Sequence, residues 1–302
     1  MNGCVANTDF DWYAFLEAQP RLDEVNFWQP SGGRNRFHVV SPGEPFFFRL
    51  KSPHNAIAGF GWFARHERSV RSSLAWGAFG PKNGAPDLAT MRHRIEAYRS
   101  SPSQATDPEV GCLMIANPIF FPRGQWIEQP RDWHPSIQVW KRYDLTVGEG
   151  LRLLRECHLG GPIPAHEERA RYGPAQLVRP RLGQGTFRIA VNAAYEGACT
   201  VTGEHSLPVL EAAHIQPFAM DGPHQVENGL LLRTDIHRLF DQGYVTVTPD
   251  HHFLVSRRLK EEFDNGKTYY DLQGRMIRLP PQPADQPSPS LLAWHNEQVF
   301  LG

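Results

Sequence analysis

Glycine and proline divide this chain into short apolar segments, and this feature limits its possible folds more than any other. The 302 residues include 26 glycines and 26 prolines, about one residue in six against an average of about one in eight. Glycine loses much conformational freedom on folding and proline lacks a backbone donor, so both interrupt regular elements. The pattern favours turns and short strands over a helical bundle.

The first half of the chain is predicted to form strands and a helix. Apolar, β-prone runs bounded by glycine and proline occupy 42–50, 57–63 and 112–121. Residues 84–99 have apolar side chains at helical spacing, with a start expected near Asp87. Several strands with one helix predict a small α+β barrel.

Tryptophan and histidine are unevenly distributed, which indicates two domains with different roles. Seven of the eight tryptophans lie in the first 140 residues, and six of the fourteen histidines lie within 205–252. The predicted organisation is an aromatic-rich domain at 1–145, a linker at 146–185 and a histidine-rich domain at 186–302.

The predicted linker is rich in glycine, proline and charge. Within it, residues 158–185 carry two glutamates and four arginines, a net charge of +2, the arginines being Arg169, Arg171, Arg179 and Arg181. Two interpretations stay open: a solvated connector, or a basic arm along a phosphate backbone.

Charge, hydropathy and cysteine spacing exclude several classes of protein. A net charge of -1 excludes a uniform polyanion-binding field, so a nucleic-acid partner needs local basic patches. No apolar run approaches the ~18 residues of a transmembrane helix, and the N-terminus lacks the features of a secretory signal. The four cysteines form no CxxC pair, which argues against a cysteine zinc site or a disulfide scaffold. A reduced cytoplasmic setting is expected.

The second domain is predicted to begin with a helix over 186–197, with Thr186 as its N-cap. Two apolar stretches, 199–203 and 208–215, suit a β-hairpin. A short strand then precedes a helix from about Asp235.

Four residues of the second domain form a pattern with chemical meaning: His214, Asn228, His237 and Asp241. Asn228 follows His214 by 14 residues, and His237 follows nine residues later. Asp241 is four positions beyond His237, so the two share a helix face where they can hold a divalent cation. A histidine on a facing strand can deprotonate water near neutral pH, while a metal neutralises phosphate charge. The pattern predicts phosphodiester hydrolysis.

The surrounding sequence resembles the HNH endonucleases, whose ββα-metal motif is a two-stranded hairpin followed by a metal-binding helix. The matching blocks are EAAHI, NGLLL and HRLFD, with PRLGQGTFR upstream and LLAWHNEQVF near the end, close to a branch of restriction endonucleases. The resemblance covers 179–301. It implies that His214 is the general base, that Asn228 organises the loop and that His237 binds metal. The expected cofactor is a divalent ion, with Mg²⁺ preferred for its hard oxygen chemistry and Mn²⁺ or another divalent ion as alternatives.

One position departs from the family pattern. Many members have an Asp, Glu or His that binds metal immediately before the general base, and here that residue is Ala213. Asp241, Asp235 and Glu211 are candidates for the missing ligand. Asp241 has the best helical geometry, Asp235 is expected to cap the helix, and Glu211 is expected to face away from His214. The accessory zinc that four cysteines hold in some members cannot form here.

The first domain is similar to PUA-like barrels, the superfamily that includes EVE, YTH and SRA modules. The similarity is diffuse over 22–145 and rests on aromatic segments such as FWQP, IAGFGWF and LAWGAFGPKNG. It implies a module that recognises a modified base, which needs flat apolar walls for stacking. The tryptophans available as walls, or else as core residues, are Trp28, Trp62, Trp76 and Trp126.

A local basic surplus accompanies these aromatic residues. Residues 65–99 have seven basic and three acidic side chains, a charge of +4 in a chain whose total is -1. Such a cluster suits a nucleic-acid surface, with a solvated helix face as the alternative. The expected DNA contacts are Arg65, Arg68, Arg71, Arg179 and Arg181.

These features together predict an α+β DNA endonuclease with an N-terminal PUA-like β-barrel and a C-terminal ββα-metal domain. The expected role is a modification-dependent restriction enzyme acting on double-stranded DNA, with modified cytosine as one target. The alternatives are a non-catalytic reader of modified DNA and a nuclease effector without modification preference. A homodimer would supply the two active sites that double-strand cleavage by single-metal sites requires.

Overall fold

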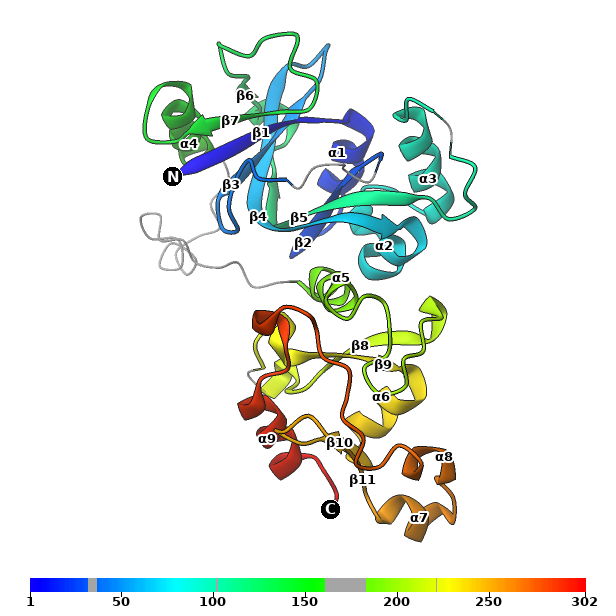
Figure 1. Ribbon diagram of the computed structural model, residues 1–302. Coiled ribbons are helices and arrows are strands. Elements are labelled where there is room, and N and C mark those ends of the chain that lie inside the picture. The colour runs from blue at the N-terminus through cyan, green and yellow to red at the C-terminus, as the bar shows by residue number, and fades with distance from the viewer. Residues whose placement is uncertain (32–36, 102, 161–182, 221) are drawn as a thin grey trace. The chain divides into compact units, whose positions relative to one another are not determined.

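The computed structural model describes residues 1–31, 37–101, 103–160, 183–220 and 222–302. The chain divides into two compact units, Met1–Thr186 and Phe187–Gly302 (Figure 1), each with its own hydrophobic core. All four cysteines are buried with free thiols. Every helix within the described ranges is too short or too polar to span a bilayer.

The first unit is an α+β domain built on one large mixed sheet. Its strands are β1 (Asn2–Thr8), β2 (Glu24–Gln29), β3 (Pro45–Leu50), β4 (Ala56–Arg71), β5 (Glu109–Phe120), β6 (Ile127–Glu128) and β7 (Trp140–Asp144). Its α-helices are α1 (Phe10–Glu17), α2 (Ser72–Phe79), α3 (Leu88–Ala97) and α4 (Gly148–Gly160). The strand order is β2-β5-β4-β3-β1-β7, with β6 beside β4, and only β1 and β3 pair in parallel among the described ladders. Since no described ladder joins β2 to β7, the strand pairing gives no evidence of barrel closure.

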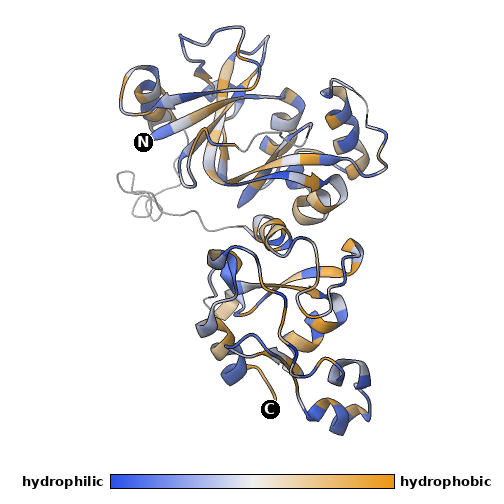
Figure 2. Ribbon diagram, viewed as in Figure 1, coloured by the Kyte–Doolittle hydropathy of each residue, from blue (hydrophilic) through white to orange (hydrophobic). Residues whose placement is uncertain are grey.

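Both faces of this sheet are buried. Along β3, Phe46 and Phe48 lie in one apolar cluster and Phe47 lies in another, as the two-residue period of a strand requires. Helix α1 adds Trp12 to the first cluster, and α4 adds Leu153 to the second. Hydrophobic residues along β4 and β5 are visible in Figure 2. The sheet is therefore the central layer of the unit.

The strands and the helix expected in the first domain form as β3, β4, β5 and α3. Asp87 is the N-cap of α3 and accepts a hydrogen bond from the Thr90 amide at 2.7 Å. Strand β4 is longer than expected: it pairs with β5 as far as Arg71, with three shifts of register on the way. The start of the predicted linker is wrong, because α4 packs its buried Leu153 into the first unit.

The second unit consists of two β-hairpins surrounded by helices. Its strands are β8 (Leu210–His214), β9 (Gly229–Arg233), β10 (Val245–Val247) and β11 (Phe253–Val255). Its α-helices are α5 (Gln184–Ala194, of which most residues belong to this unit), α6 (Thr234–Asp241), α7 (Arg258–Phe263), α8 (Lys267–Tyr270) and α9 (Pro289–Gln298). Strand β8 pairs antiparallel with β9, and β10 with β11.

Two local expectations for this unit are wrong. Residues 199–203 do not pair with β8, because they form a turn in which the Gly203 amide donates to the Cys199 carbonyl at 2.9 Å. Gly203 has a φ of 73°, which a regular strand does not allow, and β9 takes the partner position instead. Thr186 is not an N-cap, because α5 already begins at Gln184.

Candidate active site

One hairpin and the helix after it hold the predicted catalytic residues. His214 is the last residue of β8 and pairs with Gly229, the first residue of β9. Asn228 directly precedes β9, and His237 lies on α6, which follows β9 without a loop. Helix α6 contacts both strands. The local order is therefore strand, strand and helix, within one compact unit.

Asn228 ties together the loop between β8 and β9. Its side chain is fully buried. Its Oδ1 accepts from the Gln216 amide at 2.9 Å, and its Nδ2 donates to the carbonyls of Gln216 and Pro223, both at 2.9 Å. All these partners are backbone groups, so the amide fixes the path of the chain immediately after His214.

His214 has the protonation state that a general base needs. Burial, helped by the charges of His224 and His237, lowers the pKa of His214 to about 4. The imidazole is therefore neutral at physiological pH. Its Nε2 is buried and has no hydrogen-bond partner among the described residues.

The imidazole of His237 lies between two carboxylates. Its Nδ1 is 2.7 Å from Oε2 of Glu211, and its Nε2 is 3.4 Å from Oδ2 of Asp241. Burial raises the pKa of Asp241, as does the nearby Glu211, while His237 opposes the rise. The cluster therefore combines one imidazole with two carboxylates that repel each other.

The contact between Glu211 and His237 was missed by the sequence interpretation. Glu211 was expected to face away from His214, and that direction was treated as a reason to discount it. Glu211 and Ala213 are two residues apart on β8, so they share a strand face. The same two-residue period, applied to Ala213 instead of His214, would have identified Glu211 as the carboxylate on that face.

Asp235 does not cap α6. The N-cap is Arg233, whose side chain makes no capping hydrogen bond. Asp235 instead accepts two hydrogen bonds from the Arg233 guanidinium, at 2.6 and 2.7 Å, and one from the Tyr269 hydroxyl at 3.0 Å. These bonds tie the Asp235 carboxylate to Arg233 and Tyr269.

The donor chemistry of Glu211, His237 and Asp241 suits a divalent cation, but the three side chains do not converge on one point. Glu211 and Asp241 contact different nitrogens of the His237 ring. These two nitrogens point in different directions from the ring. In agreement with this, no group of three or more His, Cys, Asp or Glu side chains among the described residues is arranged to hold a metal ion. A cation on His237 would therefore share it with a single carboxylate.

The four tryptophans predicted as base-pocket walls are spread over the first unit. Trp28 packs against the cluster of Phe46, Trp62 packs against the cluster of Phe47, and Trp126 packs against both. The indole of Trp28 donates to the Asn83 carbonyl at 3.0 Å, and that of Trp126 donates to the Phe121 carbonyl at 3.0 Å. Trp76, on α2, is half-buried. The structure does not bring the four rings together.

Most of the basic side chains in 65–99 form ion pairs or hydrogen bonds within the first unit. Four cations form ion pairs at 2.5 to 3.1 Å, namely Arg65 with Glu67, Lys82 with Asp23, Arg92 with Asp107 and Arg99 with Glu96. Arg94 donates to the Gly84 carbonyl. Within the described ranges, the exposed Arg68 and Arg71 form no ion pair.

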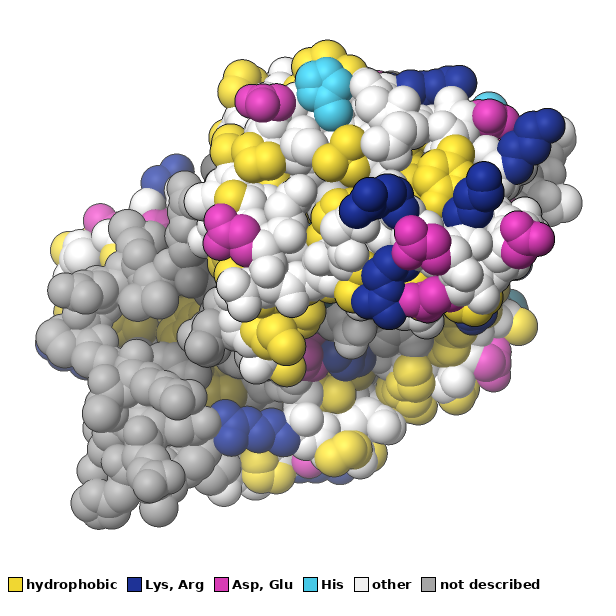
Figure 3. Space-filling view, turned by 90° about the horizontal axis from the view of Figure 1, so that it is seen from below, with side chains coloured by type: hydrophobic (Ala, Val, Ile, Leu, Met, Phe, Trp, Pro, Cys, Tyr) yellow, Lys and Arg dark blue, Asp and Glu magenta, His cyan; other side chains and the backbone are white. Residues whose placement is uncertain are grey.

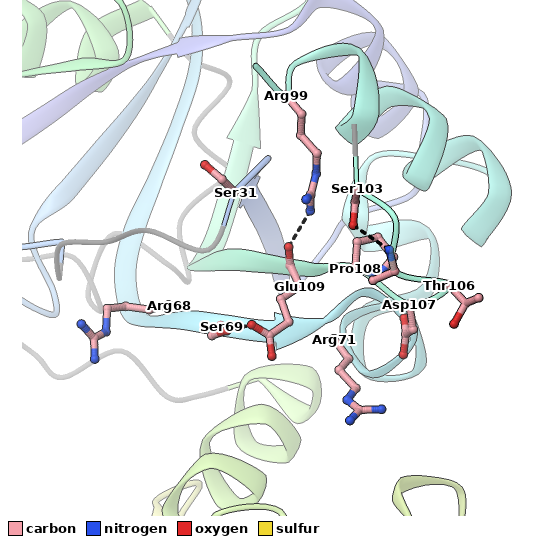
Figure 4. Close-up of a pocket in the computed structure, with 11 residues that line it drawn as sticks. Ser31, Arg68, Ser69, Arg71, Arg99, Ser103, Thr106, Asp107, Pro108 and Glu109 are labelled. Carbon is pink, nitrogen blue, oxygen red and sulfur yellow. Dashed lines mark hydrogen bonds between the residues drawn. The ribbon is translucent and has the colours of Figure 1, made fainter. Parts of the chain in front are cut away.

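Arg68 and Arg71 extend from the end of β4 beside an open cavity of about 820 Å³ (Figure 4). The cavity is also lined by Ser69 and Thr106, and by Arg99, which donates to the Glu109 carbonyl at 2.7 Å. Guanidinium and hydroxyl groups are the side chains that most often contact nucleic-acid phosphates. None of the four tryptophans lines this cavity.

Charge elsewhere is mixed. On the face shown in Figure 3, lysine and arginine side chains lie among aspartate and glutamate side chains, as the net charge of -1 leads one to expect. Arg179 and Arg181, the remaining predicted DNA contacts, lie outside the described residues.

Residues 199–248 match the HNH_2 family, described as HNH endonuclease. The chain carries an HNH endonuclease domain. The match contains His214, Asn228, His237 and Asp241, and the protein is therefore an enzyme of the DNA endonuclease class. Nucleases with this domain generally use a divalent metal ion.

Two solved structures illustrate the wider similarity of this endonuclease. ASCH from Zymomonas mobilis is 12% identical, with a TM-score of 0.34, covering 51% of this chain and 94% of that chain. The modification dependent TagI restriction endonuclease is 12% identical, with a TM-score of 0.30, covering 93% of this chain and 77% of that chain. The comparison with curated proteins found no match.

Proposed function

We propose that this endonuclease hydrolyses DNA with a single divalent ion held on α6, and that its first unit selects DNA that carries a modified base. One observation supports the catalytic half most strongly. A neutral His214 lies within electrostatic reach of His237, whose ring contacts two carboxylates. A base without a proton and a cation-binding helix are the two parts that phosphodiester hydrolysis needs.

In this mechanism His214 takes a proton from a water molecule whose oxygen attacks phosphorus. The new P–O bond forms as the bond from phosphorus to the leaving oxygen breaks, and the proton stays on the imidazole until solvent removes it. The lowered pKa keeps the ring free of a proton at the start of each cycle. Asn228 fixes the backbone after the base, which limits the positions that the imidazole can adopt.

His237, through Nε2, and Asp241 would hold the ion, which we propose to be Mg²⁺ with Mn²⁺ as the nearest substitute. Such an ion neutralises charge on the phosphate and on the leaving oxygen. Glu211 would accept the Nδ1 proton of His237 and so orient the ring, as carboxylates commonly do for metal-binding histidines. Two protein ligands are enough for Mg²⁺, which keeps several waters and takes further ligands from phosphate.

For the first unit we propose a PUA-like module that recognises a modified base, such as a modified cytosine. Partly buried tryptophans supply stacking surfaces, with Trp28 and Trp62 on separate faces of the sheet as alternative walls. Arg68 and Arg71 have charge available for phosphates. We also propose that a homodimer provides two active sites for double-strand cleavage.

Plasmid nicking in Mg²⁺, Mn²⁺ or EDTA tests the catalytic half. We expect metal-dependent nicking, lost in EDTA and in His214→Ala. The control is His205→Ala, which removes an exposed histidine from the same unit and should leave nicking unchanged. Nicking in EDTA, or full activity of His214→Ala, would overturn the proposal.

Cleavage of DNAs that differ only in base modification tests the recognition half. We expect methylated or hydroxymethylated DNA to be cut faster than unmodified DNA, whereas equal rates would identify a nuclease without modification preference. Arg68→Ala and Arg71→Ala together should weaken binding and reduce its salt dependence. Arg142→Ala, at an exposed arginine on β7 of the same unit, should not.

A further inference from the structure

The ring of Phe187 lies flat against the proposed base. The ring centroids of Phe187 and His214 are 3.8 Å apart, and their planes differ by 9°. Phe187 is 1% exposed and projects from α5, an element outside the hairpin and α6. It belongs to the block PRLGQGTFR, to which no role has been assigned above. The contact therefore links this upstream block to the catalytic residue.

Gly229 leaves the space that the stack needs. It pairs with His214 across the hairpin. A Cβ atom at Gly229 would lie 3.0 Å from Cζ of Phe187 and 2.4 Å from a methyl group of Val191. Both distances are too short for ordinary packing, so any larger residue would push α5 away from the hairpin. The absence of a side chain at this position lets the phenyl ring reach the imidazole.

Ring packing dominates the surroundings of the imidazole. The ring of His224 approaches that of His214 edge-on, with centroids 5.3 Å apart and an interplanar angle of 70°. The His214 Nε2 atom has no hydrogen-bond partner among the described residues. Histidine rings are most often oriented by a hydrogen bond at one nitrogen. Here the flat contact with Phe187 and the edge contact with His224 also restrict the ring.

We propose that Phe187 is a positioning residue for the general base, holding the His214 ring in one orientation and shielding one of its faces from water. This inference rests on the proposed function, because it takes His214 to be the base. The shielding contributes to the burial that keeps the ring neutral. A phenyl ring achieves both effects without competing for the proton.

If Phe187 were only a core residue, substituting it would change stability alone. The test therefore needs measurements that a loss of core packing does not change. The variants are Phe187→Leu and Phe187→Met, of which the second keeps more of the volume in an unbranched chain. The matched control is Phe253→Leu, which removes an equally buried phenyl ring from β11 in the same unit. All are measured as full-length proteins, at a temperature where each remains folded, with DNA and Mg²⁺ varied.

We expect both Phe187 variants to lower kcat at least tenfold with little change in KM, since a freely rotating base spends less time in the reactive orientation. The pH at which kcat falls on the acid side of its profile should rise from about 4 towards 6.5. Water then reaches the imidazole, and the pKa of His214 is lowered less by burial. The other titratable groups that act on it, His224 and His237, are unchanged in these variants. The control should lose stability and keep kcat and its pH profile.

The inference is wrong if the folded Phe187 variants match the control in kcat and in the position of the acid limb. If both fail to fold, the pKa of His214 in the wild-type protein, followed by NMR of its ring proton, decides the shielding. A value at or above 6.5 would refute it. Failure of the proposed function is distinct, because His214→Ala would then retain nicking whatever the Phe187 variants do.

Discussion

Asn228→Asp is the substitution whose effect follows most directly from the geometry. It preserves size and shape, and it keeps the bond from the Gln216 amide to the side-chain oxygen. It turns the other two hydrogen bonds, to the carbonyls of Gln216 and Pro223 at 2.9 Å, into contacts between oxygens. The change therefore replaces one buried donor with an acceptor and adds one titratable group.

The magnitude can be worked from those bonds. Leaving a buried acceptor without its donor costs about 1–3 kcal/mol, so two such losses cost about 4 kcal/mol. Asn228→Ala leaves the same two carbonyls and also the Gln216 amide without partners, three losses of about 1–3 kcal/mol each, so it should be at least as destabilising. A shift of about 1 Å at the base would lower kcat about 100-fold.

The stability lost in Asn228→Asp should depend on pH. The introduced carboxyl is buried and faces two carbonyls, so its folded-state pKa lies above the unfolded value. In its protonated form, the carboxyl can donate a hydrogen bond to one of the two carbonyls. The deficit relative to wild type should therefore be largest above the folded pKa and should shrink as the pH falls through it.

Urea unfolding, amide hydrogen exchange in residues 215–228 and plasmid nicking measure these effects. The control is Asn265→Asp, because the side chain of Asn265 only accepts a bond, from the Gly266 amide at 2.8 Å, and an aspartate can still accept it. The reasoning would be refuted if Asn228→Asp were as stable as the wild type at neutral pH. It would also be refuted if amide hydrogen exchange in residues 215–228 did not change.

Three further predictions concern titration and metal affinity. The acid limb of kcat should lie near 4, because the base keeps its neutral form down to its lowered pKa; a pH–rate profile with a limb at 6.5 would contradict this. Glu211→Gln should raise the Mg²⁺ concentration for half-maximal nicking about tenfold by weakening the orientation of His237, and an unchanged midpoint would exclude that role. Burial lowers the pKa of His295 to about 4, so folding stability should fall by up to about 3 kcal/mol as the pH drops from 6.5 towards 4. His295→Gln should flatten that slope in urea unfolding.

Local patterns predicted the elements that lie close together along the chain. The strands β3, β4 and β5, the helix α3 with its Asp87 cap, and the helix that carries His237 all follow from periodicity and capping signals. The partner of β8 did not follow, because 199–203 and β9 are both apolar and nearby. The turn at Gly203 decided between them.

The sites that depend on several elements were less predictable. The tryptophans look alike in the sequence, yet Trp28 and Trp62 lie on different faces of the sheet. The basic residues also look alike, and only the fold shows that Arg65 pairs internally while Arg68 and Arg71 stay exposed. Ion-pair partners come from loops and helices whose proximity no spacing rule gives.

The sequence by itself determined which residue types stand at the strand end, the loop anchor and the helix face, because those positions follow from short-range periodicity. The tertiary structure alone decided that Glu211 contacts His237 and that Phe187 lies on His214. Both contacts join elements that are separate along the chain. Such contacts depend on how strands pair and how helices pack, and these are set by the whole core of the unit.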